Sequence, residues 1–224
     1  MKVAALVSGG KDSMLALHLA SEEHEISCLV NISSTNPDSY MFHTVNSHIL
    51  DYISAAMDLP LVRGHTAGEK ESELLDLERT IRILKVEGLV VGGVASNYQK
   101  ERFEKLCNSL NLKLVSPLWG MDEEDIMNEV ITKFHVIIVR VSAMGFDETW
   151  LGRTLDFKAL EELMALKERY GINITGEGGE YESLVLDAPL YRKRLEIIEG
   201  EKKFDGMSGI FEVKRVKLVD KVDL

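Results

Sequence analysis

The sequence predicts an α/β fold built on a parallel sheet, followed by a smaller α+β domain. Short apolar runs alternate with segments whose apolar residues recur every three or four positions, as in a sheet covered by helices. The first run leads directly into the glycine-containing segment Ser8-Gly9-Gly10-Lys11-Asp12-Ser13. After Pro117 this alternation gives way to a mixed pattern. We therefore expect one domain over residues 1–120 and a second over residues 121–224.

The first half is expected to follow a βαβα order. Its strands are expected at 3–7, 26–30, 88–92 and 112–115, and its helices at 14–20, 48–57, 71–85 and 98–110. In the second half we expect helices at 122–133 and 155–170, a strand at 135–141, an irregular aromatic segment at 143–154, and several β-like runs from 182 onward. Acidic residues open the helix at Asp122, which suits its positive N-terminal end.

Composition excludes several classes of protein. Of the 224 residues, 45% are hydrophobic and 28% charged, the balance of a soluble globular chain. A net charge of −11 argues against nonspecific binding to nucleic acid, so no nucleic-acid partner is expected. No apolar stretch of about 20 residues and no signal-peptide pattern is present. We expect a cytoplasmic protein without a membrane partner.

Cysteine and histidine usage excludes further chemistry. Cys28 and Cys107 form neither a CxxC pair nor a set with metal-ligand spacing, and the histidines are scattered. We therefore expect no zinc site and no cysteine-based reaction.

The segment from Ser8 to Ser13 has the chemistry of a phosphate-binding loop. A glycine pair after a buried strand brings backbone N–H groups close to an anion, and the next helix points its free N–H donors at the same place. Lys11 adds a positive charge, and Asp12 suits a bound Mg²⁺ ion. The alternative is an ordinary turn in which Asp12 or Ser13 caps the helix. The Walker A pattern is excluded because Asp12 follows Lys11, and the GxGxxG pattern is absent.

This strand, loop and helix resemble the PP-loop of the N-type ATP pyrophosphatases, whose domain is a Rossmann-like adenine nucleotide alpha hydrolase (HUP) fold. The resemblance implies that ATP is split into AMP and pyrophosphate. It implies phosphate contacts from Ser8, Gly9, Gly10, Lys11 and Ser13, a Mg²⁺ contact from Asp12, and further nucleotide contacts from Val30, Asn31, Ser33, Gly93 and Ser96. Lys11 and Asp12 are thereby expected to act in catalysis.

Members of this superfamily differ in the nucleophile that displaces AMP. Sulfur-inserting members need cysteines, and no cysteine follows Cys107. Glutamine-dependent members carry a separate amidase, for which this chain has no room. Ammonium supplied from outside is therefore the expected nitrogen source.

Further motifs resemble the diphthine–ammonia ligase (diphthamide synthetase) family in its short, archaeal-like form. They are the segments 39–44, 93–99 and 142–147 and, above all, Gly176-Glu177-Gly178-Gly179-Glu180-Tyr181-Glu182. The resemblance implies that diphthine on translation elongation factor 2 is converted with ATP and ammonium into diphthamide, AMP and pyrophosphate.

The resemblance also implies residues for the acceptor and for catalysis. Glu177, Glu180 and Glu182 are expected to act in catalysis, by holding ammonium, a metal ion or a cationic acceptor; the alternative is a solvated glycine turn. Residues expected to contact substrate are Tyr40, His43, Tyr98, Gln99, Arg102, Trp150, Gly152, Arg153, Gly178 and Gly179. For Trp150 a core position is the alternative, and for Arg102 a solvated helix position.

Two other functions fit the same loop. One is a PP-loop ligase that adenylates a small carboxylic acid, and the other is a sensor that binds ATP or AMP without turning it over. Homo-oligomerisation is left open by the sequence.

Overall fold

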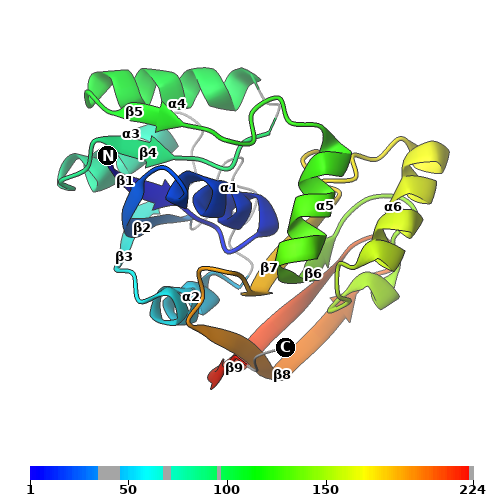
Figure 1. Ribbon diagram of the computed structural model, residues 1–224. Coiled ribbons are helices and arrows are strands. Elements are labelled where there is room, and N and C mark those ends of the chain that lie inside the picture. The colour runs from blue at the N-terminus through cyan, green and yellow to red at the C-terminus, as the bar shows by residue number, and fades with distance from the viewer. Residues whose placement is uncertain (35–45, 68–71, 95–96, 222–224) are drawn as a thin grey trace. The chain divides into compact units, whose positions relative to one another are not determined.

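A computed structural model describes residues 1–34, 46–67, 72–94 and 97–221. The chain divides into two compact units (Figure 1). The first contains residues 1–8 and 12–120, and the second contains residues 9–11 and 121–224. The sequence analysis expected residues 1–120 to form one domain, whereas the central loop residues Gly9–Lys11 belong to the second unit.

The first unit is a five-stranded parallel sheet with helices on both faces. The sheet has the order β3-β2-β1-β4-β5, which reverses direction between β1 and β4. Its elements are β1 (Lys2–Leu6), α1 (Lys11–Ser21), β2 (Glu25–Ser34), the short helix η1 (Ser47–Ile49), α2 (Leu50–Met57), β3 (Leu61–Thr66), α3 (Ser72–Arg82), β4 (Gly88–Val90), α4 (Asn97–Ser109) and β5 (Lys113–Val115). The predicted α/β class is confirmed.

Successive side chains of the strands point to opposite faces of the sheet, and those on one face form a core with α3 and α4. Ala4, Val30 and Leu89 are fully or almost fully buried and pack against Leu77 of α3 and Phe103 of α4. Helix α1 lies on the opposite face (Figure 1). Because both faces are covered, these strands read in the sequence as continuous apolar runs.

Several boundaries differ from the sequence prediction, and one strand was missed. Strand β2 continues to Ser34, four residues beyond its predicted end, because it pairs with β3 as far as Thr66. Strand β3 was missed, since polar residues and Gly64 interrupt its apolar pattern. A Cβ atom on Gly64 would lie 2.3 Å from Oγ1 of Thr80 in α3, so the absence of a side chain at Gly64 leaves room for this helix. Helix α1 begins three residues earlier than predicted, at Lys11.

The second unit is a four-stranded sheet of order β7-β6-β9-β8 with two longer helices. The sheet pairs are antiparallel, and the predicted α+β character is confirmed. Its elements are α5 (Glu123–Lys133), β6 (His135–Val141), η2 (Glu148–Trp150), α6 (Phe157–Tyr170), β7 (Tyr181–Asp187), β8 (Lys193–Phe204) and β9 (Gly209–Asp220). Asp122 and Asp156 cap α5 and α6 by accepting backbone N–H bonds.

Among the helices of the described residues, none is long and apolar enough to span a bilayer.

Candidate functional site

The loop after β1 has the local geometry of an anion site. Gly9 has a positive φ of 84°, which glycine adopts without strain, and helix α1 begins two residues later. Ser8 N donates to Ser13 Oγ over 3.2 Å, and the two hydroxyl groups also lie 3.2 Å apart. The N–H groups in the first turn of a helix have no partner within the helix, and such groups can bind an anion. In α1 the first of them, Lys11 N, donates to Ser183 Oγ.

The sheet order places this loop where open α/β sheets bind ligands. The chain leaves β1 at the carboxyl edge, next to β4, at the point where the strand order reverses. Asn31 strengthens this edge, because its Nδ2 donates to the Val7 carbonyl over 2.9 Å. Asn31 is nearly fully buried and lies inside β2. Val30, Asn31 and Ser33, which were expected to contact the nucleotide, all lie within β2.

Gly92, which follows β4, lets two backbone segments approach closely. A Cβ atom on Gly92 would lie 2.7 Å from Ser13 Cα and 2.9 Å from the Asp12 carbonyl carbon. No side chain fits there unless the first turn of α1 moves. Gly92 was not among the predicted site residues, although it stands directly before the predicted Gly93.

The loop residues Gly9–Lys11 pack on β7 within the second unit. The Gly9 carbonyl accepts a bond from Val185 N over 2.9 Å, and Lys11 N donates to Ser183 Oγ over 3.1 Å. The Lys11 side chain is only 1% exposed. Its ammonium group donates to the Thr175 carbonyl and lies 5.3 Å from the centre of the Tyr181 ring. Lys11 is thus bonded to the residue that precedes the Gly176–Glu182 motif.

The Gly176–Glu182 motif forms a tight turn that leads into β7. Gly176 has a φ of 75°, and a Cβ atom there would lie 2.8 Å from the Tyr181 carbonyl oxygen. Glu180 accepts a bond from Asn173 N at Oε1 over 2.8 Å, and its Oε2 is buried without a hydrogen-bond partner. A Cβ atom on Gly178 would fall 2.6 Å from Glu180 Oε1, so glycine keeps space beside this carboxylate. An unpaired buried acceptor is suited to bind a cationic or N–H donor.

Asn173 connects the turn to neighbouring elements, and sequence reasoning missed it. Its Nδ2 donates to Glu123 over 3.0 Å, and its Oδ1 accepts bonds from Thr175 N and Oγ1 at 2.8 and 2.6 Å. These bonds hold the Thr175 backbone, whose carbonyl receives the Lys11 ammonium. The pattern Asn-Ile-Thr was the available signal, since asparagine often bonds the backbone two residues on.

The other two glutamates of the motif have different surroundings. Glu182 forms an ion pair with Arg140 over 3.1 Å, directly across the β6–β7 pair. Glu177 is exposed. Of the three carboxylates expected to be catalytic, Glu180 is the one with a buried free oxygen.

The predicted acceptor residues around Trp150 are engaged in internal packing. Trp150 is 5% exposed and makes an edge contact with Phe146, their ring centres being 5.1 Å apart. Arg153 lies over the Trp150 ring and binds Glu162 through both terminal nitrogens, at 2.6 and 2.8 Å. The hydrogen bond to Glu162 raises the pKa of the Arg153 guanidinium above its usual value. Gly152 lies between them with a φ of 73°.

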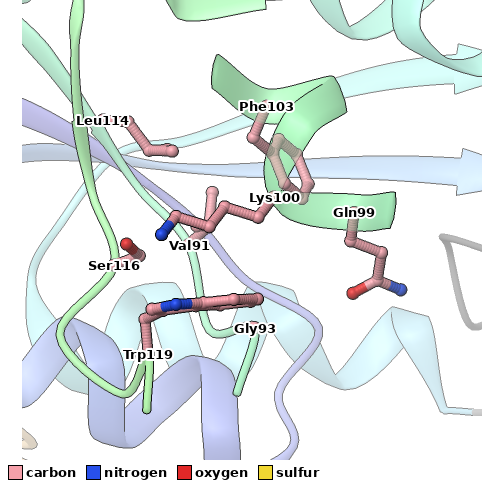
Figure 2. Close-up of a pocket in the computed structure, with 8 residues that line it drawn as sticks. All are labelled: Val91, Gly93, Gln99, Lys100, Phe103, Leu114, Ser116 and Trp119. Atoms are coloured by element: carbon pink, nitrogen blue, oxygen red, sulfur yellow. The ribbon is translucent and has the colours of Figure 1, made fainter. Parts of the chain in front are cut away.

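The remaining predicted residues lie partly outside the described chain. Tyr40, His43 and Ser96 fall outside the described residues, and the side chain of Tyr98 is likewise not described. Gly93 and Gln99 line a small pocket next to β4 and β5 (Figure 2).

Asp12 is suited to hold Mg²⁺ with the phosphates of a nucleotide. It is half-buried in the first turn of α1, beside the hydroxyl groups of the loop. Mg²⁺ is commonly bound by one or two carboxylates together with phosphate oxygens. Within the described residues, no group of three or more acidic, histidine or cysteine side chains gathers as in an all-protein metal cage.

Two domain families match the chain in succession. Residues 1–114 match the diphthamide synthase N-terminal domain, and residues 122–219 match the diphthamide synthase C-terminal domain. The chain belongs to the diphthamide synthase family. The resemblance drawn from its motifs is thereby confirmed.

Curated relatives agree with this family. The diphthine–ammonia ligase of Homo sapiens is 36% identical over 226 residues, covering 90% of this chain and 84% of that protein. The enzyme of Danio rerio is 36% identical over 221 residues, covering 88% and 86%. That of Schizosaccharomyces pombe is 34% identical over 223 residues, covering 90% of this chain but 37% of its own. This member of the diphthamide synthase family is an enzyme of the ligase class, and its role lies in diphthamide biosynthesis.

Solved structures are also similar, among them a predicted subunit of tRNA methyltransferase from Methanocaldococcus jannaschii. It is 16% identical, covers 84% of this chain and 97% of that chain, and has a TM-score of 0.46. This likeness is too weak to support an argument.

The cysteines of this diphthamide synthase family member are poor nucleophiles. Cys28 and Cys107 are both free and buried. Burial raises the pKa of the Cys107 thiol to about 11 and also raises that of Cys28. Since the thiolate is the reactive form, neither residue is suited to carry sulfur or an acyl group at neutral pH.

Proposed function

We propose that this enzyme converts diphthine on translation elongation factor 2 into diphthamide, consuming ATP and ammonium and releasing AMP and pyrophosphate. The family and its curated relatives support diphthamide biosynthesis as the setting. The ATP-dependent steps, the Mg²⁺ requirement and the protein substrate are our assignments. The net charge of −11 favours a protein partner over RNA, and we assign the reaction to the cytoplasm.

The first step activates a carboxylate that would otherwise not react with ammonia. A carboxylate oxygen of diphthine bonds to the α-phosphorus of ATP, and the bond from that phosphorus to pyrophosphate breaks. We assign the phosphates to the N–H groups of Gly9 and Gly10 and to the hydroxyl groups of Ser8 and Ser13. Such fixed donors stabilise developing negative charge without rearranging. Asp12 would hold Mg²⁺, which neutralises phosphate charge.

The second step transfers nitrogen. The nitrogen of ammonia bonds to the acyl carbon, AMP leaves with the former carboxylate oxygen, and the nitrogen loses a proton. We assign Glu180 to this step, because its buried Oε2 is free to accept an N–H bond. A carboxylate so placed can hold ammonium and take up its proton.

One observation carries the proposal. The ammonium group of Lys11, from the loop, is bonded to the carbonyl of Thr175, which directly precedes the motif containing Glu180. The two segments that carry the family resemblance are therefore in contact, although 164 residues separate Lys11 and Thr175. This contact, which lies within the second unit, supports a role for both segments in one reaction.

The test uses the purified chain with ATP, Mg²⁺, ammonium and elongation factor 2 bearing diphthine. Mass spectrometry of the acceptor should show the exchange of a carboxylate for an amide, with one AMP formed per amide. Glu180→Gln should lower amide formation by about 100-fold or more, the usual effect of losing a general base. Glu161→Gln, an exposed acid on α6, is the matched control and should retain full activity.

Two results would favour the rival functions. Turnover with a small carboxylic acid, but none with the diphthine-bearing factor, would identify a different adenylating ligase. Tight ATP binding without pyrophosphate release under any acceptor would identify a sensor.

A further inference from the structure

The segment between α6 and β7 is buried although it has no regular structure. Residues 172–175 lie outside the helices and strands of the second unit, yet Ile172, Ile174 and Thr175 are buried. A buried N–H or C=O group without a partner costs free energy, so the backbone of such a segment needs partners of another kind. In this segment side chains take that role.

The N–H groups of the segment donate to side-chain oxygens. Asn173 N donates to Glu180 Oε1 over 2.8 Å, and Thr175 N donates to Asn173 Oδ1 over 2.8 Å. The first bond joins the segment to the Gly176–Glu182 motif, and the second folds the Asn173 side chain back onto its own segment. Both bonds depend on where Asn173 lies.

Carbonyl groups of the segment accept from side chains as well. The Tyr181 hydroxyl donates to the Ile174 carbonyl over 2.7 Å, and the Lys11 ammonium donates to the Thr175 carbonyl. That ammonium also lies over the Tyr181 ring, 5.3 Å from its centre. The side chains around the segment therefore determine its shape, and a change in one of them can move its backbone.

The carboxamide of Asn173 is bonded at both ends. Its Oδ1 accepts from Thr175 N and Thr175 Oγ1 at 2.8 and 2.6 Å, and its Nδ2 donates to Glu123 Oε1 over 3.0 Å. The reverse orientation would turn the NH₂ group toward the Thr175 N–H and the oxygen toward a carboxylate, and neither pair could bond. The observed orientation therefore requires an acceptor at Glu123.

Glu123 connects this carboxamide to two helices. It is the first residue of α5, directly after the cap residue Asp122. Its Oε1 accepts the bond from Asn173, while its Oε2 accepts from the Lys167 ammonium of α6 over 2.8 Å. Because the two partners use different oxygens, the bond to Asn173 does not require the exposed ion pair with Lys167.

This arrangement gives the two oxygens of Glu180 different surroundings. Oε1 accepts the Asn173 N–H, whereas Oε2 is buried without a hydrogen-bond partner. The terminal torsion of a glutamate side chain is broad, so the carboxylate rotates unless a partner holds it. The bond at Oε1 restricts this rotation and thereby determines the direction in which Oε2 points.

We propose that Asn173, held in place by Glu123, is a positioning residue that orients Glu180 for the transfer of nitrogen. This inference rests on the proposed function, because it takes Glu180 as the group that holds ammonium. Asn173 itself contacts no substrate and acts through the direction of the Glu180 carboxylate.

The isosteric variant Asn173→Asp tests this role. It keeps an oxygen for Thr175 but turns a second oxygen toward Glu123, and two carboxylates at hydrogen-bond distance repel each other. We expect kcat/KM for ammonium to fall about tenfold, because small displacements of catalytic groups are costly, and the KM for ATP to stay unchanged. The assay temperature is one at which circular dichroism shows the variant to be folded.

Glu123→Gln should rescue this variant. In the double variant Asn173→Asp/Glu123→Gln the new carboxamide donates to the new carboxylate, so the hydrogen bond returns with its polarity reversed. We expect kcat/KM for ammonium to return to within about twofold of the wild-type value. Lys167→Met is the control for the lost ion pair and should keep full activity, since exposed ion pairs contribute little. A double variant as impaired as Asn173→Asp alone would overturn the proposal.

A second combination tests whether Asn173 acts through Glu180. In the Glu180→Gln background, Asn173→Asp should lower the remaining activity by less than about twofold, because residues that act through one group do not have additive effects. A further loss as large as the one in the wild-type background would show that Asn173 acts elsewhere, and the proposal would be wrong.

Hydrogen exchange tests the contact without any turnover. The Asn173 N–H should exchange slowly although it belongs to no helix or strand. Glu180→Ala should speed its exchange about tenfold, while the Thr175 N–H keeps its rate. Asn173→Asp should also speed exchange at position 173, and the addition of Glu123→Gln should restore it. Equal exchange of the Asn173 N–H with and without the Glu180 carboxylate would contradict the proposed orientation.

The experiments separate the failure of this inference from the failure of the function. If the exchange rates are as expected but the wild-type chain amidates no diphthine, the proposed function is wrong and the orientation of Glu180 by Asn173 stands. If diphthine is amidated and Asn173→Asp keeps its kcat/KM for ammonium, the function stands and this inference is wrong.

Discussion

Lys11 has a structural role, and in our proposal it also has a role in ATP binding. Its side chain is buried and bonded to the Thr175 carbonyl, and its position in the loop is the reason for the proposed role with the phosphates. Thr175 is itself only 1% exposed, so its carbonyl depends on this donor. A substitution at Lys11 should therefore affect both catalysis and folding.

Lys11→Met should separate these two roles. Methionine keeps an unbranched apolar side chain beside Tyr181 but donates no hydrogen bond. We expect AMP formation to fall by about 100-fold or more, as for other lost transition-state donors. Leaving a buried carbonyl unsatisfied should lower the free energy of unfolding by about 1–3 kcal/mol. Urea denaturation and a pyrophosphate-release assay measure the two effects; Lys85→Met, at an exposed position, is the control. AMP formation at the wild-type rate would remove Lys11 from the phosphate site.

The buried thiols of Cys28 and Cys107 lead to a second prediction about individual residues. With a pKa of about 11, Cys107 has about one thiolate per thousand molecules at pH 8. Iodoacetamide at that pH should leave Cys28 and Cys107 unmodified in the folded chain and alkylate both in urea. Rapid modification of the folded chain would contradict the buried positions. Since folding favours the neutral thiols, their contribution to stability is present below the unfolded thiol pKa of about 8.5 and is lost as pH rises toward the folded value.

At the scale of secondary-structure elements, the segment between β4 and α4 lies very close to the first turn of helix α1. This close approach depends on the missing side chain of Gly92, which faces backbone atoms of Asp12 and Ser13. Backbone cannot move aside as the end of a flexible side chain can. The position of the first turn of α1, and so of its N–H groups, is coupled to β4 through this contact.

Gly92→Ala should displace that first turn. We expect a loss of about 1–3 kcal/mol in the free energy of unfolding, the usual cost of overpacking, together with weaker ATP binding. Gly93→Ala is the control for stability, because its Cβ atom would lie 3.8 Å from the nearest atom, Gln99 Oε1. Chemical denaturation and calorimetric titration with ATP measure the two effects. Equal stability of the two variants would show that the close contact at Gly92 does not fix the position of the first turn of α1.

Elements were predicted well where local pattern decides them. Strand β6 was predicted with its observed bounds, and α5 begins after the acidic cap at Asp122. Strand β3 was missed because Arg63, Gly64 and His65 are tolerated at the edge of the sheet, where pairing with β2 decides the structure. Pairing with β3 also extended β2 beyond its predicted end.

At the scale of the whole molecule, the central residues of the loop belong with the second unit. Strand β7 lies at the edge of its sheet, and the N–H of Val185 bonds Gly9. Within the second unit, β7 therefore holds the backbone of Gly9 and Lys11 through Val185 and Ser183. This arrangement links the PP-loop to the part of the chain that carries Glu180.

Val185→Pro should test this link in the full chain. Proline removes the N–H that Gly9 accepts, and an edge strand tolerates proline better than a central one. We expect ATP affinity to fall about tenfold, since a hydrogen bond that shapes the loop is lost. Val185→Ala keeps the N–H and is the matched control: it should lose stability, because Val185 is fully buried, but keep its affinity for ATP. Similar ATP affinities for both variants would show that the bond to β7 does not shape the site.

The fold class could be predicted from the sequence and is confirmed, and the sequence also identified the loop from Ser8 to Ser13 and the glutamates of the second motif as candidates, because each is encoded by neighbouring residues. Periodicity, glycine positions and cap residues act over a few positions, and they can be read without knowing the path of the chain. The tertiary structure alone decided that Lys11 is buried against Thr175, that Asn173 supports Glu180, and that Gln99 lines a pocket beside β4. These depend on contacts between residues far apart in sequence, which no local pattern specifies.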